Sequence, residues 1–307
     1  METDENTTIL VTGAAGRQGA SGRAVVERLL SKGRRVRAMV RTRDERASVL
    51  EKAGAEIVVG DFADYASLCS AVEGVRSAYF CHPVGPGITE AAGLFAAAGR
   101  EKGLSHVVDL SLAAARPDSP SPQGRAQWVA EQIFDWAGLA ATHLRIAAFF
   151  MENIALLDGP GIRKRGRIAN SFGALSLPWI SGVDVGNIAA SLLLAGPQPA
   201  DRRLVVAGGV ERLNYGQIAD VIARQIGRAV QYEELTPDAW HRELVAASTA
   251  KGEPNIRGAD HLTAQSIALR KNPIPALPDR VEELTGQAAI GFSQFIKMRL
   301  TDFSGTA

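Results

Sequence analysis

Residues 8–19 have the sequence TILVTGAAGRQG, a short aliphatic run followed by three glycines at intervals of three residues. The aliphatic run predicts a buried strand. An amphipathic segment follows, with Val25, Val26, Leu29 and Leu30 on one face, and Gly33 ends it as a helix C-cap would. Residues 36–40 predict a second strand. A glycine turn between a strand and a helix of such a βαβ unit indicates a dinucleotide-binding site.

The chemistry of a pyrophosphate explains the glycine turn. Its oxygens need backbone N–H groups and the positive end of a helix dipole close by, and a Cβ would hold them away. We therefore expect the turn to bind the cofactor through five of its residues, namely Gly13, Gly16, Arg17, Gln18 and Gly19. Glycine-rich turns also occur for structural reasons alone, so the flanking strands and helix carry the prediction.

Composition excludes several protein classes. The chain has 307 residues, a net charge of +1 and two cysteines. This balance gives no indication of nucleic acid, and the cysteine count gives none of a disulfide framework. No apolar run reaches the length of a membrane span, and the first residues are polar and acidic. We expect a cytoplasmic protein whose partner is a small molecule, with no nucleic acid, membrane or metal involved, and we leave the oligomeric state open.

Strand and helix patterns continue to alternate after residue 40. Further strands are predicted at 56–59, 75–81, 107–110 and 141–146, with helices at 45–53, 65–73, 89–102 and 127–137. This order predicts a Rossmann-type, doubly wound parallel sheet whose ligands lie at the carboxyl ends of the strands. Such ends carry Gly13, Arg41, Asp61, His82 and Ser111. Residues 1–153 are therefore predicted to form a dinucleotide-binding domain.

The second half of the chain follows a different pattern. Short strands are predicted at 177–181 and 202–207, with helices at 183–195, 215–226, 237–250, 258–269 and 292–300. We expect residues 154–307 to form a smaller α/β substrate-binding cap, with some segments returning to the main sheet. The Pro- and Ser-rich residues 116–122 are predicted to be a loop over the crevice.

Several motifs, in order along nearly the whole chain, resemble the NmrA-like family of atypical short-chain dehydrogenases/reductases. They include the turn at 12–19, Gly60-Asp61-Phe62, Thr142-His143-Leu144-Arg145 and Phe150-Met151-Glu152-Asn153. Some members of this family are NADPH-dependent reductases of ketones or quinones, and others are redox sensors that bind NADP without clear catalysis. The resemblance implies an adenine-side contact for Asp61 and Phe62. It does not choose between enzyme and sensor.

One feature of the larger superfamily is missing. Its proton donor is a tyrosine with a lysine four residues later, and none of the four tyrosines here has that lysine. Many NmrA-like proteins also keep a lysine four residues before the glutamate that matches Glu131, where this chain has Gln127. A neutral amide cannot lower a neighbouring pKa as an ammonium group does.

Individual residues allow a functional and a structural interpretation. Arg41 can bind the 2′-phosphate of NADP through its planar fork, or be a solvated surface arginine, and Arg17 and Arg43 can assist it. Asp61 is an adenine contact or a helix N-cap. His82 is a candidate for the nicotinamide site and for proton donation, or a polar loop residue.

The remaining catalytic candidates are neutral. Ser111 can donate a hydrogen bond to a substrate carbonyl or be a turn residue, and Gln127 can polarise a substrate oxygen or be a solvated helix residue. Phe149, Phe150, Asn153 and Trp128 are predicted to line the substrate side, although such aromatic residues are more often core.

Together these features predict an NADPH-dependent reductase that transfers a hydride to a ketone or quinone carbonyl. The expected substrate is a quinone or an aromatic polyketide-like compound. The proton then comes from solvent, from His82 or Ser111, or from the substrate. The alternative is a non-catalytic NADP-binding redox sensor that acts through a protein partner.

Overall fold

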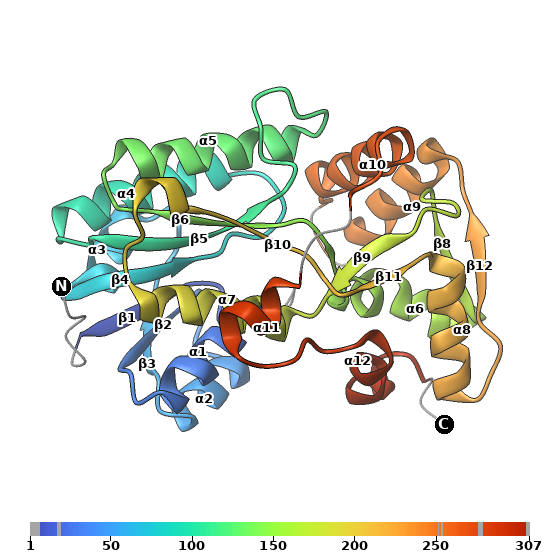
Figure 1. Cartoon of the computed structure of the whole chain (residues 1–307), viewed down its shortest axis with the longest axis horizontal. Coiled ribbons are helices and arrows are strands. Elements are labelled where there is room, and N and C mark those ends of the chain that lie inside the picture. Colours follow the sequence, from blue (N-terminus) through green and yellow to red (C-terminus); the bar gives the residue numbers. More distant parts are fainter. Residues whose placement is uncertain (1–6, 17–19, 251, 253, 276–278, 305–307) are drawn as a thin grey trace.

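A computed structural model of the chain describes residues 7–16, 20–250, 252, 254–275 and 279–304. Its centre is a parallel seven-stranded sheet in the order β10-β6-β5-β4-β1-β2-β3 (Figure 1). The strands are β1 (Thr8–Val11), β2 (Val36–Val40), β3 (Glu56–Val59), β4 (Val75–Phe80), β5 (His106–Leu112), β6 (Thr142–Ile146) and β10 (Leu204–Ala207). The Rossmann-type fold predicted from the sequence is confirmed.

Helices cover both faces of this sheet. One face carries α1 (Ser21–Ser31), α2 (Glu45–Lys52), α7 (Gly182–Ala195) and α11 (Arg280–Thr285), and the other carries α3 (Tyr65–Val72), α4 (Ile88–Glu101) and α5 (Pro122–Trp136). Ile9 and Val11 of β1 pack into the first core, while Leu10 between them packs into the second. Successive side chains of a strand point to opposite faces, so a strand covered on both faces has a continuous apolar run.

A second body of structure lies beyond the carboxyl ends of the strands (Figure 1). It contains two small sheets, β11-β9-β7 and β12-β8, and its own core around Trp179, Phe172 and Phe292. Its elements are β7 (Phe149–Phe150), a π-helix at Ile154–Asp158, α6 (Gly159–Arg165), β8 (Arg167–Asn170), β9 (Leu177–Ile180), β11 (Glu211–Leu213), α8 (Tyr215–Ile226), β12 (Gln231–Glu234), α9 (Pro237–Thr249), α10 (Ile256–Lys271) and α12 (Phe292–Met298), with a 3-10 turn at Leu300–Asp302. A further 3-10 turn, Ala200–Arg202, precedes β10 of the main sheet.

The C-terminal half contributes to both bodies. β10 pairs with β6 at the edge of the main sheet, and Gly186 of α7 lies against α1 so closely that a Cβ there would be 2.5 Å from the Ser21 carbonyl oxygen. Segments after residue 153, namely β10 and α7, thus belong to the core of the nucleotide-binding half. The domain boundary at residue 153 stays a prediction. No helix in the described ranges is long and apolar enough to cross a membrane.

Two element boundaries differ from the predicted ones and affect the site. β5 continues to Leu112, because Ser111 and Leu112 pair with Arg145 and Ile146 of β6. α5 begins at Pro122, not at residue 127, with Ser121 as its N-cap. The Pro- and Ser-rich segment thus ends in a helix start, where a proline at the first helical position is favourable.

Candidate active site

The carboxyl ends of β1 to β4 bring the predicted cofactor residues to one edge of the sheet. At this edge Gly13 has a φ of 71°, a backbone conformation that glycine adopts without strain. A Cβ on Gly13 would be 3.2 Å from the Cβ and Sγ of Cys81, which packs against the turn from β4. The Gly16 N–H donates to the Gly13 carbonyl at 3.0 Å. Arg17, Gln18 and Gly19 lie outside the described residues.

Gly22, the second residue of α1, is a further glycine beside this turn and is absent from the sequence-based predictions. A Cβ there would lie 2.7 Å from the carbonyl carbon and oxygen of Gly13. Gly22 therefore allows α1 to approach the turn, which is one role of a glycine in dinucleotide-binding βαβ units. Gly22 continues the three-residue spacing of the glycines at 13, 16 and 19, and this spacing could have identified it from the sequence.

The start of α1 fits an anionic group. Ala20 precedes the helix without a side-chain cap, and the first turn contains no acidic residue. Among the described residues no N-cap side chain binds its first N–H groups, and the helix dipole favours a negative charge at this end. These observations fit the pyrophosphate of a dinucleotide.

Arg41 and Asp61 face each other across the ends of β2 and β3. The Arg41 Nε lies 3.5 Å from Asp61 Oδ2, and the arginine side chain is 85% exposed. Asp61 does not cap a helix, since Asp64 is the N-cap of α3 and Asp61 Oδ1 accepts from the Ala63 N–H at 3.0 Å. An exposed guanidinium beside the glycine turn fits the 2′-phosphate of NADP.

The side chains of Arg43 and Arg46 point in different directions. Arg43 is bound away from the site, donating to the Ile57 carbonyl at 2.9 Å and to Glu51 at 3.3 Å. Its predicted assistance to Arg41 does not fit this placement. Arg46, which the sequence analysis did not select, donates from Nη1 to the Ala15 carbonyl in the glycine turn at 2.7 Å. Nothing in the sequence separates these two arginines, because both directions depend on tertiary contacts.

His82 follows β4 and is half-buried. Its Nδ1 lies 2.8 Å from the Pro83 carbonyl oxygen, which can only accept, so Nδ1 carries the hydrogen and Nε2 presents a lone pair. Burial lowers the pKa of His82, partly opposed by this hydrogen bond. The ring of Phe62 lies 5.5 Å from the His82 ring. A neutral imidazole with a free Nε2 accepts a hydrogen bond more readily than it donates a proton.

The side chains of Ser111 and Gln127 are both buried and hydrogen-bonded to other parts of the protein. Ser111 is fully buried in β5 and its hydroxyl donates to Glu131 Oε1. Gln127 is 3% exposed and its Nε2 donates to the Leu110 carbonyl at 3.2 Å. Both placements argue against the predicted contacts with a substrate oxygen. The physical reason is that β5 and α5 extend further than predicted and enclose these side chains.

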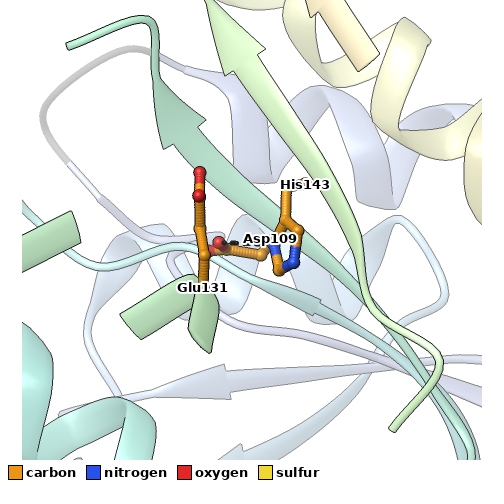
Figure 2. A group of neighbouring side chains, drawn as sticks. All are labelled: Asp109, Glu131 and His143. Atoms are coloured by element: carbon orange, nitrogen blue, oxygen red, sulfur yellow. Dashed lines mark hydrogen bonds and ion pairs between the residues drawn. The ribbon is translucent and has the colours of Figure 1, made fainter. Parts of the chain in front are cut away.

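A buried polar cluster lies between β5, β6 and α5 (Figure 2). Asp109, Glu131 and His143 come within 4.8 Å of one another. Arg145 Nε donates to Glu131 Oε1 at 2.8 Å, and His143 Nδ1 lies 3.3 Å from Asp109. Burial opposes protonation of His143, but the carboxylates around it outweigh burial, so the pKa of His143 lies above its ordinary value. These hydrogen bonds and ion pairs connect β5, β6 and α5.

The predicted substrate residues lie on β7, at the start of the π-helix and on α5. Phe149 and Phe150 form β7, where Phe149 packs against Phe172 and Trp179 of the cap core and Phe150 against the main core. Asn153 is half-buried and begins the π-helix without a side-chain cap bond. Trp128 lies half-buried on α5. Phe150 thus lies where the two bodies meet, and Asn153 follows three residues later.

Comparisons with known proteins agree with this arrangement. A profile of the NmrA-like family matches residues 5–253. A (4-alkanoyl-5-oxo-2,5-dihydrofuran-3-yl)methyl phosphate reductase from Streptomyces griseus is 31% identical, covering 92% of this chain and 95% of that protein. An NAD(P)H azoreductase from Xenophilus azovorans is 27% identical, covering 96% and 99%. The structure of an Escherichia coli NADPH-dependent quinone oxidoreductase with NADPH superimposes with a TM-score of 0.76 at 22% identity, covering 95% and 99%.

Proposed function

This chain belongs to the NmrA-like family, and from that membership and the geometry of the sheet edge we propose that it is an NADPH-dependent reductase of small molecules. The observation that supports this proposal most directly is that the glycine turn, the uncapped start of α1 and the exposed Arg41 lie together at the carboxyl edge of the main sheet. Two full-length relatives named as reductases support this assignment. The chain is accordingly an NAD(P)H-dependent oxidoreductase that uses NADPH.

Each described residue has a role in this proposal. Gly13 and Gly22 allow the close approach of backbone to the pyrophosphate, and Arg41 binds the 2′-phosphate. His82 accepts a hydrogen bond through Nε2 from the cofactor or substrate. Phe150, Asn153 and Trp128 line the substrate side, and the cap excludes water from the reacting centre.

We further propose that the substrate is a quinone or a ketone conjugated to an aromatic system. NADPH, when bound, supplies the hydride, and one proton completes the reduction, so that a quinone leaves as the hydroquinone. Because Ser111 and Gln127 are enclosed and His82 is neutral, solvent or the substrate itself delivers that proton. Hydride addition to a quinone gives a phenolate whose negative charge is delocalised over the ring, so the protonation that follows needs no strong protein acid.

The test is steady-state NADPH oxidation with a panel of quinones and polycyclic ketones. We expect turnover with at least one quinone, NADPH preferred to NADH, and no turnover by the Gly16→Val variant, whose added side chain obstructs the phosphates. Cofactor binding without turnover of any acceptor would contradict the proposal and favour the redox sensor, which acts through a protein partner.

A further inference from the structure

A cavity of about 400 Å³ opens at the carboxyl edge of the sheet beside the loop that carries His82. Its walls are formed by Pro86, Pro122, Pro254, Ile256, Arg257 and Asp260. Asn255 Nδ2 donates to the Val84 carbonyl at 3.1 Å, so the start of α10 is bound directly to this loop. The cavity therefore lies between the cap and the loop after β4, at the entrance to the proposed site.

The only cationic side chain in the wall of this cavity, among the residues the structure describes, is Arg257, and it has no ion pair or hydrogen bond there. The acidic member of the wall, Asp260, is already engaged, with Oδ1 2.9 Å from His241 Nε2. Arg242, in the adjoining cavity with His241, also has no ion-pair partner within the described ranges. The two arginines outnumber the one carboxylate, that of Asp260, so the described residues around these two cavities carry a net positive charge.

The position of Arg257 on its helix strengthens this point. It is the second residue of α10, where the helix dipole disfavours a cation. Three helices begin next to the cavity, namely α4 at Ile88, α5 at Pro122 and α10 at Ile256. Glu90 lies in the first turn of α4, whereas the first turns of α5 and α10 contain no acid.

The starts of α5 and α10 already have side-chain caps, because Ser121 accepts from the Gly124 N–H and Asn255 from the Gly258 N–H. The guanidinium of Arg257 is therefore the group in this wall that remains available to a ligand. An unpaired guanidinium favours an anionic ligand.

The rest of the wall is apolar. Ile256 is 52% exposed, and three prolines complete the surface around it. We propose that this cavity binds the acidic group of the substrate, with Arg257 as the specificity-determining residue and the apolar wall against an aromatic body. The inference rests on the proposed reductase function and narrows its substrate class to aromatic quinones or ketones that carry a sulfonate, carboxylate or phosphate.

A matched pair of acceptors tests the inference. The ratio of kcat/KM for 1,2-naphthoquinone-4-sulfonate to kcat/KM for 1,2-naphthoquinone is measured for the wild type and for Arg257→Gln. We expect the variant to lower this ratio about tenfold, the factor that corresponds to about 1.4 kcal/mol of binding, through KM of the sulfonate. Arg202→Gln, at the opposite edge of the sheet before β10, is the matched control and should leave the ratio unchanged.

A binding titration separates this inference from the proposed function. Naphthalene-2-sulfonate and 2-naphthol are titrated by calorimetry into the protein saturated with NADP⁺. We expect Arg257→Gln to weaken only the sulfonate, and increasing salt to reduce the difference. A wild type that reduces the neutral quinone while Arg257→Gln changes neither ratio nor sulfonate affinity overturns the anion site alone. If the wild type reduces neither quinone, the proposed reductase function is wrong. The sulfonate titration then tests the anion site independently.

Discussion

At the scale of single residues, the direction of a side chain decides whether a basic residue serves the cofactor. Arg41 and Arg43 are two positions apart and both are exposed, yet Arg41 lies beside Asp61, while Arg43 donates to the Ile57 carbonyl and to Glu51. These two hydrogen bonds direct the guanidinium of Arg43 towards β3 and α2. The two arginines therefore form a natural pair of variant and control.

Arg41→Ala should weaken NADPH binding by about 1.5–3 kcal/mol, the range for a hydrogen bond to a charged group, and leave NADH binding unchanged. Arg43→Ala should alter neither, because its guanidinium does not face the site. Dissociation constants from fluorescence titration of both cofactors measure this difference. Equal losses for NADPH and NADH in Arg41→Ala would show that Arg41 does not bind the 2′-phosphate.

His82 provides a prediction about the proton. Burial lowers the pKa of His82 and so favours the neutral imidazole, whose single N–H points at the Pro83 carbonyl. His82→Gln should therefore reduce kcat only a few-fold, far less than the roughly 10²–10⁴-fold contribution of a general acid. The wild-type kcat should stay level between about pH 6.5 and 8. A thousand-fold fall in the variant would restore His82 as the acid.

At the scale of elements, α1 packs against the glycine turn with no room for a side chain at Gly22. Gly22 faces the Gly13 carbonyl, whereas a Cβ on Gly93 in α4 would meet nothing within 4 Å. A helix glycine can thus either permit close packing or merely weaken its helix. The two positions separate these effects.

Gly22→Ala should destabilise the protein by about 1–3 kcal/mol, the usual range for overpacking, and weaken cofactor binding because the turn is displaced. Gly93→Ala should stabilise by about 0.5–1 kcal/mol, since alanine is the better helix former, with cofactor binding unchanged. Urea unfolding and NADPH titration of both variants provide the measurement. Unchanged binding by a folded Gly22→Ala would mean that α1 can move without disturbing the phosphate site.

At the scale of the whole molecule, α10 connects the cap to the nucleotide-binding half. His261 of α10 is buried with Nδ1 2.7 Å from the Ser121 hydroxyl at the start of α5, and burial lowers the pKa of His261 to about 4. In the unfolded chain a histidine titrates near 6.5. As the pH falls from about 6.5 to 4, the unfolded state binds a proton that the folded state refuses, so stability is lost over this window.

His261→Gln should lower stability at pH 7, because the buried contact with Ser121 is disturbed, but should then lose less on acidification. The slope of unfolding free energy against pH should be smaller than in the wild type by up to about 1.4 kcal/mol per pH unit. Urea unfolding at pH 7, 6 and 5 measures it. Other buried groups, such as His106 and Glu152, are present in both proteins and cancel in the difference. Parallel curves would contradict a depressed pKa for His261.

The sequence by itself determined the fold class, the place of the dinucleotide turn and the edge of the sheet at which Arg41, Asp61 and His82 gather. These features are local or periodic: an apolar run covered on both faces, glycines before a helix, and parallel strands whose carboxyl ends share one edge. Which of the candidate side chains can reach a ligand depends on tertiary contacts. Ser111 and Gln127 became enclosed because β6 pairs with the extended β5 and α5 covers it. The entrance cavity depends on Asn255 meeting Val84 from 171 residues away. Such contacts join segments distant in the chain, so no local pattern contains them.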